Sequence, residues 1–155
     1  MKPKATKEQL DLLKEQSFSA ETPGTILADF ETLLEFIGVE GLASSGKYCR
    51  LPLSALSAID ERMRHPLRPN LERPQQLSFP HLNGLYMLLR CTALGITKGA
   101  GSRARICIDP ALWEEWRSLQ PVEQYVALLK FVMYPDWSVV DGSRGSSWES
   151  WHNWQ

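Results

Sequence analysis

Apolar residues recur at helical spacing in several stretches of this chain, most regularly between Thr22 and Gly38. There they follow one another at three- and four-residue steps, while the acidic side chains lie mostly elsewhere on the helical wheel. Thr22 suits an N-cap, Pro23 suits the first helical position, and Gly38 suits the left-handed position after the last turn. The pattern predicts an amphipathic helix whose core face holds Ile26, Leu27, Phe30, Leu33, Leu34 and Ile37.

The stretch that follows, residues 41–53, is too short and too rich in Gly and Ser for a helix. It predicts two brief extended segments around a Ser45–Gly46 turn. Ser54 then suits the N-cap of another helix. In that helix Leu56, Ile59 and Met63 are expected inside, with Asp60 and Glu61 outside.

Three prolines, at positions 66, 69 and 74, exclude a continuous helix or a central strand from the segment that comes next. We therefore predict a Pro-rich, basic linker over residues 64–78. Its Pro66-Leu67-Arg68-Pro69 matches the PxxP pattern, but an ordinary linker with three prolines produces that pattern by chance.

The second half predicts a helix over residues 80–94 that is apolar nearly all round and therefore central. Only Asn83, Met87, Arg90 and Thr92 are left for an exposed stripe. A Gly-rich hairpin over 96–108 follows. Asp109 and Pro110 then begin a helix with Leu112, Trp113, Trp116 and Leu119 inside, and Pro121 begins another with Tyr125, Leu128, Leu129 and Val132 inside.

The two halves share an order of helix, Gly-punctuated extended segment and helix, at a spacing of 54 to 56 residues. Gly41-Leu42 corresponds to Gly95-Ile96, and Arg50–Ser54 corresponds to Arg105–Asp109. The sequence therefore predicts a mainly α protein with small β-hairpins, built as tandem winged-helix-like modules. The expected divisions are an N-terminal arm (1–21), a first unit (22–63), the linker (64–78), a second unit (79–134) and a Trp-rich tail (135–155).

Composition places the chain among ordinary globular proteins, with 43% hydrophobic and 23% charged residues in 155. The N-terminus lacks the apolar region of a signal peptide, and no run approaches the roughly 18 apolar residues of a membrane span. We expect a soluble, cytoplasmic protein. Its cysteines, Cys49, Cys91 and Cys107, are odd in number and form no CxxC pair, so reduced and mostly buried thiols are expected.

A formal net charge of −1 hides a basic middle. Residues 41–105 carry ten Lys or Arg against three acidic residues, whereas both flanking regions are acidic. The acidic ends can neutralise this middle in the folded chain, which is the interpretation we favour. Alternatively, an exposed basic middle would be a footprint for nucleic acid or an acidic partner.

No catalytic, cofactor or metal constellation is predicted, and we expect no enzymatic activity. The three histidines, His65, His81 and His152, are isolated from other metal ligands, and no phosphate-binding or nucleophile motif is present. Two hypothetical contact sets remain. For nucleic acid they are Arg64, Arg68, Arg73, Lys98, Arg103 and Arg105, and for protein contact they are Trp148, Trp151 and Trp154, which either pack back onto the domain or meet a partner.

Several segments between Thr22 and Val132 carry a family resemblance. They are TPGTILADFETLLEFIG, GLASSGKY, LPLSAL, RPQQLSFPHLNGLYMLLR and PVEQYVALLKF. This region resembles the N-terminal part of the bacterial plasmid Ri open-reading-frame-3 family. The resemblance implies an association with mobile elements and a longer parent chain, and it brings no biochemical function and no catalytic residues.

The leading functional hypothesis is therefore a protein-interaction or assembly module, with self-association or a protein partner engaged through the Trp-rich tail. The alternative is a nucleic-acid-binding protein that uses the basic hairpin and linker. An enzyme with an unrecognised site ranks third.

Overall fold

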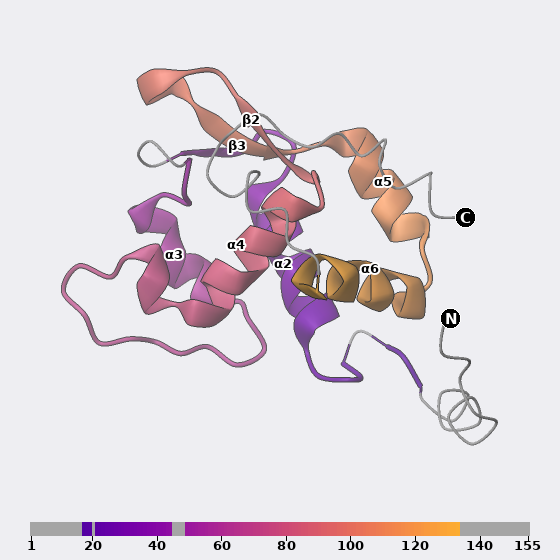
Figure 1. Cartoon of the computed structure of the whole chain (residues 1–155). Coiled ribbons are helices and arrows are strands. Elements are labelled where there is room, and N and C mark those ends of the chain that lie inside the picture. The colour runs from indigo at the N-terminus through magenta and orange to yellow at the C-terminus, as the bar shows by residue number, and fades with distance from the viewer. Residues whose placement is uncertain (1–16, 20, 45–48, 134–155) are drawn as a thin grey trace.

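Helix α4 (Pro80–Cys91) lies at the centre of the fold, as its nearly all-round apolar sequence predicted. The computed structural model describes residues 17–19, 21–44 and 49–133 (Figure 1). In that part of the chain α4 packs against α2 (Ile26–Ile37), α6 (Pro121–Met133) and the sheet. Its buried side chains are Leu82, Leu85, Tyr86, Leu88, Leu89 and Cys91.

A small antiparallel sheet joins the two halves of the chain. Its strands are β1 (Leu42–Ala43), β2 (Gly95–Lys98) and β3 (Arg105–Ile108), in the order β1-β3-β2. β2 and β3 form the predicted hairpin. In the first half β1 pairs with β3, with Leu42 opposite Ile106, and the predicted Ser45–Gly46 turn lies outside the described residues.

The close approach of β1 to β3 depends on Gly41. Its backbone has φ +72°, and a Cβ there would lie 2.4 Å from both Cys107 Sγ and the Ile106 carbonyl oxygen. No other residue type fits this position, because both the left-handed backbone and the contact distance exclude a side chain. Gly41 thus allows β1 to lie against the edge of the β2–β3 hairpin. There the two residues of β1 pair with β3.

Helix α2 begins three residues later than predicted. Its N-cap is Thr25, not Thr22, and Pro23 precedes the helix. Thr25 donates its hydroxyl to Asp29 Oδ2 at 2.6 Å, which ties the first turn together. The predicted end is confirmed, since Gly38 follows the helix with φ +62° and its N–H bonds to the Leu34 carbonyl.

Helix α3 (Leu53–Asp60), by contrast, starts earlier than predicted, because Pro52 rather than Ser54 occupies the N-cap position. The prediction for Asp60 was wrong: it is 1% exposed. Its carboxylate accepts the backbone N–H groups of Leu67 (3.0 Å) and Arg68 (2.8 Å), so it anchors the Pro-rich loop that leads to the short 3-10 turn η1 (Gln76–Ser78).

Helix α5 (Pro110–Ser118) follows the predicted capping pattern. Asp109 Oδ1 accepts from the backbone N–H groups of Ala111 and Leu112. Trp116 is buried and its ring meets Phe30 of α2 edge to face, at 5.4 Å between centroids. This aromatic contact joins α2 and α5, which lie far apart in the sequence.

The expected inward face of α6 is partly wrong. Leu128 is buried, but Leu129 is 42% exposed, so the helix is rotated relative to the prediction, and the side chain of Val132 lies outside the described residues. Thr92, expected at the surface, is buried and donates to the Leu89 carbonyl oxygen.

One hydrophobic core runs through both predicted units. It includes Phe30 of α2, Ile59 of α3, Leu89 of α4 and Ile106 of β3. Residues 1–16 of the predicted arm and the whole Trp-rich tail lie outside the described residues. Among the helices that are described, none has the length and apolar character needed to cross a bilayer.

Candidate functional site: an apolar groove along α4

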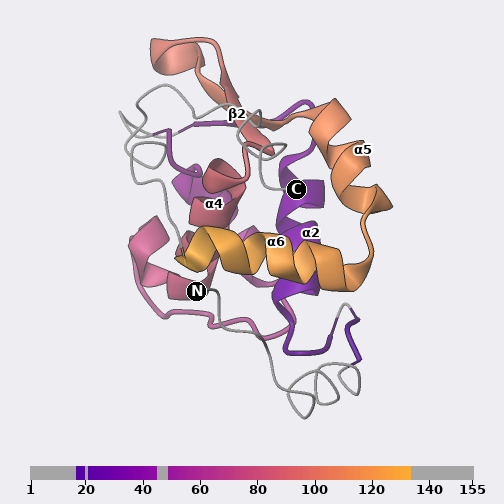
Figure 2. The ribbon, with the colours of Figure 1, turned by 45° about the vertical axis from the view of Figure 1, so that its right-hand side comes forward.

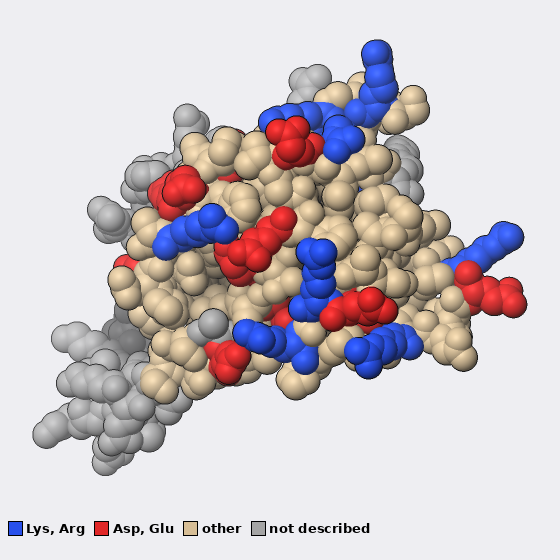
Figure 3. All heavy atoms as spheres, turned by 180° about the vertical axis from the view of Figure 1, so that it is seen from behind, with Lys and Arg blue, Asp and Glu red and all other residues tan. Residues whose placement is uncertain are grey.

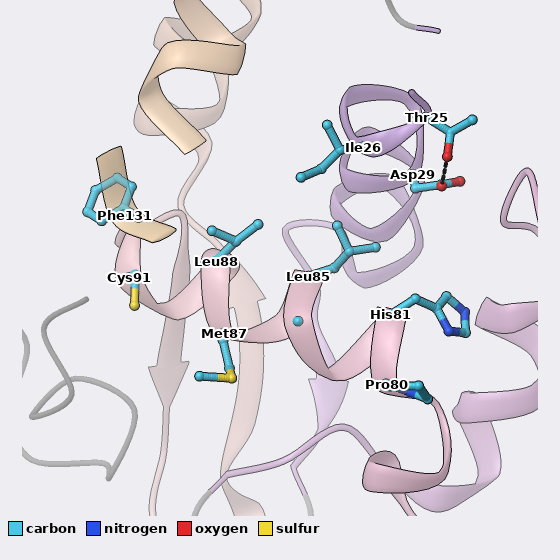
Figure 4. Close-up of a pocket in the computed structure, with 11 residues that line it drawn as sticks. Thr25, Ile26, Asp29, Pro80, His81, Leu85, Met87, Leu88, Cys91 and Phe131 are labelled. Carbon is cyan, nitrogen blue, oxygen red and sulfur yellow. Dashed lines mark hydrogen bonds between the residues drawn. The ribbon is translucent and has the colours of Figure 1, made fainter. Parts of the chain in front are cut away.

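A groove of about 610 Å³ runs along one side of α4, where the start of α2 and the end of α6 approach it (Figure 4). We call it the α4 groove. Its volume lies within the usual range for binding pockets. Its lining comes from three elements and consists of Thr25, Ile26, Asp29, Pro80, His81, Gly84, Leu85, Met87, Leu88, Cys91 and Phe131.

Gly84 is one of the residues of α4 that line the groove. This residue is exposed in the middle of α4, and a Cβ added there would meet nothing within 4 Å. A mid-helix glycine costs roughly 0.5–1 kcal/mol relative to alanine. Its presence is therefore not explained by helix stability, and a large side chain at this position would occupy part of the groove.

Of the polar members of the lining, Thr25 and Asp29 are already hydrogen-bonded, whereas neither ring nitrogen of His81 has a hydrogen-bond partner among the described residues. Asp29 accepts the Thr25 hydroxyl and, at Oδ1, the backbone N–H of Arg64 (2.8 Å). His81 points away from the centre of the groove in Figure 4, and its Nε2 lies 2.9 Å from Asp60 Oδ1. The two atoms are close enough for an ion pair, but their geometry is not that of a hydrogen bond. Both ring nitrogens of His81 are buried.

The lining of the α4 groove is mainly apolar, so it can pack against apolar side chains of a bound group. Across the described ranges, no three His, Cys, Asp or Glu residues gather as a metal site would require. What the groove offers is an apolar channel with an aromatic edge at Phe131.

The predicted nucleic-acid residues on the hairpin divide into two groups. Lys98 and Arg103 are exposed near the turn between β2 and β3. Arg105 has a structural role instead: its guanidinium donates from Nε to the Glu40 carbonyl (3.1 Å) and from Nη2 to the Gly41 carbonyl. Arg105 therefore holds the chain that enters β1.

The linker arginines lie in the loop before α4, whereas the hairpin follows α4, so the structure separates the two predicted groups by a helix of about 18 Å. Arg64 forms an ion pair with Glu21 at 3.2 Å. Arg68 and Arg73 are exposed. The six residues thus do not form one continuous contact set.

The surface charge is mixed over much of the molecule. Figure 3, seen from behind, shows basic and acidic side chains interspersed over the body, with basic groups close together where the hairpin projects. On α5, Arg117 pairs with Glu31 (3.0 Å) and lies 3.6 Å from Glu35, and its guanidinium stacks over Trp113. Part of the acidic charge of α2 is therefore neutralised by α5 rather than by the basic middle.

Tyr86 occupies the side of α4 that faces away from the groove. Its hydroxyl donates to the Cys49 carbonyl, and burial raises the pKa of its phenol above 10.0, partly offset by the positive charge of Arg90. The cysteines are free thiols, as predicted: Cys91 and Cys107 are buried and Cys49 is half-buried.

Sequence reasoning missed the groove, although two signals for it were present. Gly84 interrupts an otherwise apolar helix, and Phe131 continues the apolar pattern of α6 on the side next to Leu128. Trp148, Trp151 and Trp154 lie outside the described residues. Comparison with known proteins finds no matching family model, no matching curated protein and no matching solved structure.

Proposed function

We propose that this chain is a non-enzymatic protein-interaction or assembly module of winged-helix-like fold. The observation that carries the proposal is the apolar outer side of α4 and the groove beside it. In this proposal the groove receives the indole side chains of the Trp-rich segment, residues 148–154, either from the same chain or from a second copy. The family resemblance adds a bacterial, mobile-element setting as part of the same proposal.

The order of elements supports the winged-helix-like part. Helix α2, strand β1, helices α3 and α4 and the β2–β3 hairpin follow one another as in a winged helix, with the sheet in the order β1-β3-β2. One such unit, which draws on both halves of the chain, accounts for this order more simply than two tandem units. In it, α4 holds the place of the reading helix and the hairpin holds the place of the wing.

The outer side of α4 favours protein over DNA. A reading helix presents several polar side chains to base edges, but here only Asn83 and Arg90 could do so. Asn83 accepts from Gln76 Nε2 at 3.0 Å, and Arg90 donates to Thr97 Oγ1 at 2.8 Å. Both are occupied by neighbours in the fold, and the rest of the stripe is apolar.

The chain supplies a suitable occupant close by. Phe131 borders the groove, and helix α6 ends two residues later at Met133. Fifteen residues lead from there to Trp148, a distance of at most about 50 Å in an extended chain. Indoles are large apolar groups whose burial is strongly favourable, so a groove of this size and polarity matches them.

Substitution at Gly84 tests the proposal without disturbing the fold, because the space above it is open. Gly84→Trp should fill the groove, whereas Gly84→Ala should leave most of it free. Cleavage at Glu149 by a glutamyl endopeptidase, followed by mass spectrometry, reports whether the tail is held. Loss of about 1.4 kcal/mol of docking corresponds to about tenfold faster cleavage.

We expect faster cleavage at Glu149 in Gly84→Trp and not in Gly84→Ala. Cleavage at Glu72, in the exposed loop before α4, serves as an internal reference. If Glu149 is cut equally fast in the wild type and in both variants, the tail does not use the groove and the proposal fails. Protection of Glu149 from cleavage that does not change when the protein is diluted indicates docking within the same chain. Protection that is lost on dilution indicates docking of a second copy.

A second candidate function is nucleic-acid binding through the hairpin. It is favoured by the absence of acidic residues between positions 95 and 108, where Lys98 and Arg103 are exposed. Such contacts to phosphates give affinity that falls with salt. Titration of labelled duplex DNA at about 50 mM salt tests it: the double variant Lys98→Glu/Arg103→Glu should bind at least tenfold more weakly, and absence of wild-type binding would remove this candidate.

A further inference from the structure

Helix α6 carries a second row of apolar side chains, which do not belong to the core formed by the described residues. Val122 (41%), Val126 (42%), Leu129 (42%) and Met133 (61%) are all exposed. They follow one another at steps of four, three and four residues. This is the spacing of the contact positions of a helix pair, and we call these four residues the α6 ridge.

The ridge lies opposite the side by which α6 is held. Ala127 and Leu128 belong to the core, and Gln124 donates to the Trp116 carbonyl at 2.9 Å. Phe131, which borders the α4 groove, also lies on that inner side. Figure 2 shows α6 in front of α2 and α4, so the side of α6 that faces away from these two helices is turned toward the outside. A surface helix normally presents polar residues there.

We propose that the α6 ridge is the contact surface for a second copy of this chain, with the two α6 helices antiparallel about a two-fold axis. The spacing is self-complementary under that symmetry. Val122 lies opposite Met133 of the second copy, and Val126 lies opposite Leu129 of the second copy. Each side chain thus meets an apolar partner, as an isologous interface requires.

Charge on the flank of the ridge selects the antiparallel direction. Glu123 and Lys130 lie seven residues apart on the same edge of the ridge. The same edges of two helices face each other when the helices run antiparallel, which brings Glu123 of each copy toward Lys130 of the other. In a parallel pair these edges lie on opposite sides, and Lys130 faces Tyr125 instead. Flanking charges set orientation in this way in helix pairs generally.

The ridge is short, so the dimer is expected to be weak and to depend on concentration, as contacts below about 1,200 Å² are. Sedimentation velocity of the full chain over a concentration series measures it. Val126→Glu places a charge at the centre of the seam and should weaken the dimer at least tenfold. Because Val126 is exposed, the fold should be kept, which the unchanged circular dichroism spectrum would show.

Charge exchange provides the matched control. Lys130→Glu alone should weaken the dimer, and Glu123→Lys/Lys130→Glu in the same chain should restore it, because the pairs are re-formed in reverse. Glu123 also accepts the backbone N–H of Gln120 at 2.8 Å, so the circular dichroism spectrum of the double variant is compared with that of the wild type first. Two results would overturn the proposal. One is a wild-type chain that stays monomeric up to millimolar concentration, and the other is a dimer that Val126→Glu leaves unchanged. The α6 ridge is separate from the α4 groove, so a dimer formed through the ridge should be weakened by Val126→Glu and not by Gly84→Trp, whereas association through the groove should be weakened by Gly84→Trp and not by Val126→Glu.

Discussion

Removal of the Asp60 carboxylate is the most informative perturbation of the fold. Asp60 accepts two backbone N–H groups of the Pro-rich loop, from Leu67 and Arg68, and its Oδ1 lies 2.9 Å from His81 Nε2. Hydrogen bonds to a charged group contribute about 1.5–3 kcal/mol each. The loop residues are exposed and their amides can be hydrated after the change, so the lower figure applies. Asp60→Ala should therefore cost about 3 kcal/mol in free energy of unfolding.

Asp60→Asn provides the graded control, because one amide oxygen can still accept one of the two N–H groups. Its cost should be about half that of Asp60→Ala. Urea unfolding followed by circular dichroism measures both, and hydrogen exchange at the amides of Leu67 and Arg68 reports the loop directly. If Asp60→Ala lies within 0.5 kcal/mol of the wild type, a margin typical of neutral surface changes, the reasoning about this buried carboxylate is refuted.

Three further changes test other parts of the fold. The pKa of Tyr86 is raised in the folded state, so the folded protein holds the phenolic proton to higher pH than the unfolded chain does. The resulting contribution to the free energy of unfolding is present below pH 10.0 and is lost as pH rises through the folded-state pKa. Tyr86→Phe should reduce this loss of stability at alkaline pH, as measured by unfolding over a pH series. Gly41→Ala should destabilise by more than 3 kcal/mol, since its Cβ meets Cys107 at 2.4 Å, and retention of the wild-type Tm would contradict this. Asp109→Ala should cost about 1 kcal/mol by loss of the α5 cap, as measured by thermal unfolding.

The sequence predicted well those elements whose signal is local. The α4 helix, the β2–β3 hairpin and the Asp109 cap of α5 all follow from periodicity, glycine placement and capping chemistry. Each depends on residues within a few positions of one another, which is the range over which propensity and pattern act.

Features that depend on distant contacts were not predictable in the same way. Strand β1 finds its partner in β3, more than 60 residues away, and nothing in residues 41–53 specifies that choice. Asp60 is buried because two amides of a later loop need an acceptor. Leu128 and Leu129 are adjacent and equally apolar, so packing against the core rather than composition decides which one faces inward.

The candidate site shows the same division. The apolar stripe of α4 could be read from the sequence, but the α4 groove requires the start of α2 and the end of α6 to approach the same side of it. The role of Arg105 was also hidden, because its acceptors are backbone carbonyls about 65 residues earlier. Every residue carries a backbone carbonyl, so the residue types alone do not show which carbonyls accept hydrogen bonds from a side chain.

The central claim is that the α4 groove holds the Trp-rich segment, and the methyl resonance of Met87 tests it most directly. Met87 lines the groove, whereas Met63 is buried elsewhere and serves as an internal control. In methionine-methyl-labelled full-length protein, replacing Trp148, Trp151 and Trp154 by alanine should shift the Met87 signal and leave the Met63 signal in place. A Met87 signal that does not move would contradict the account.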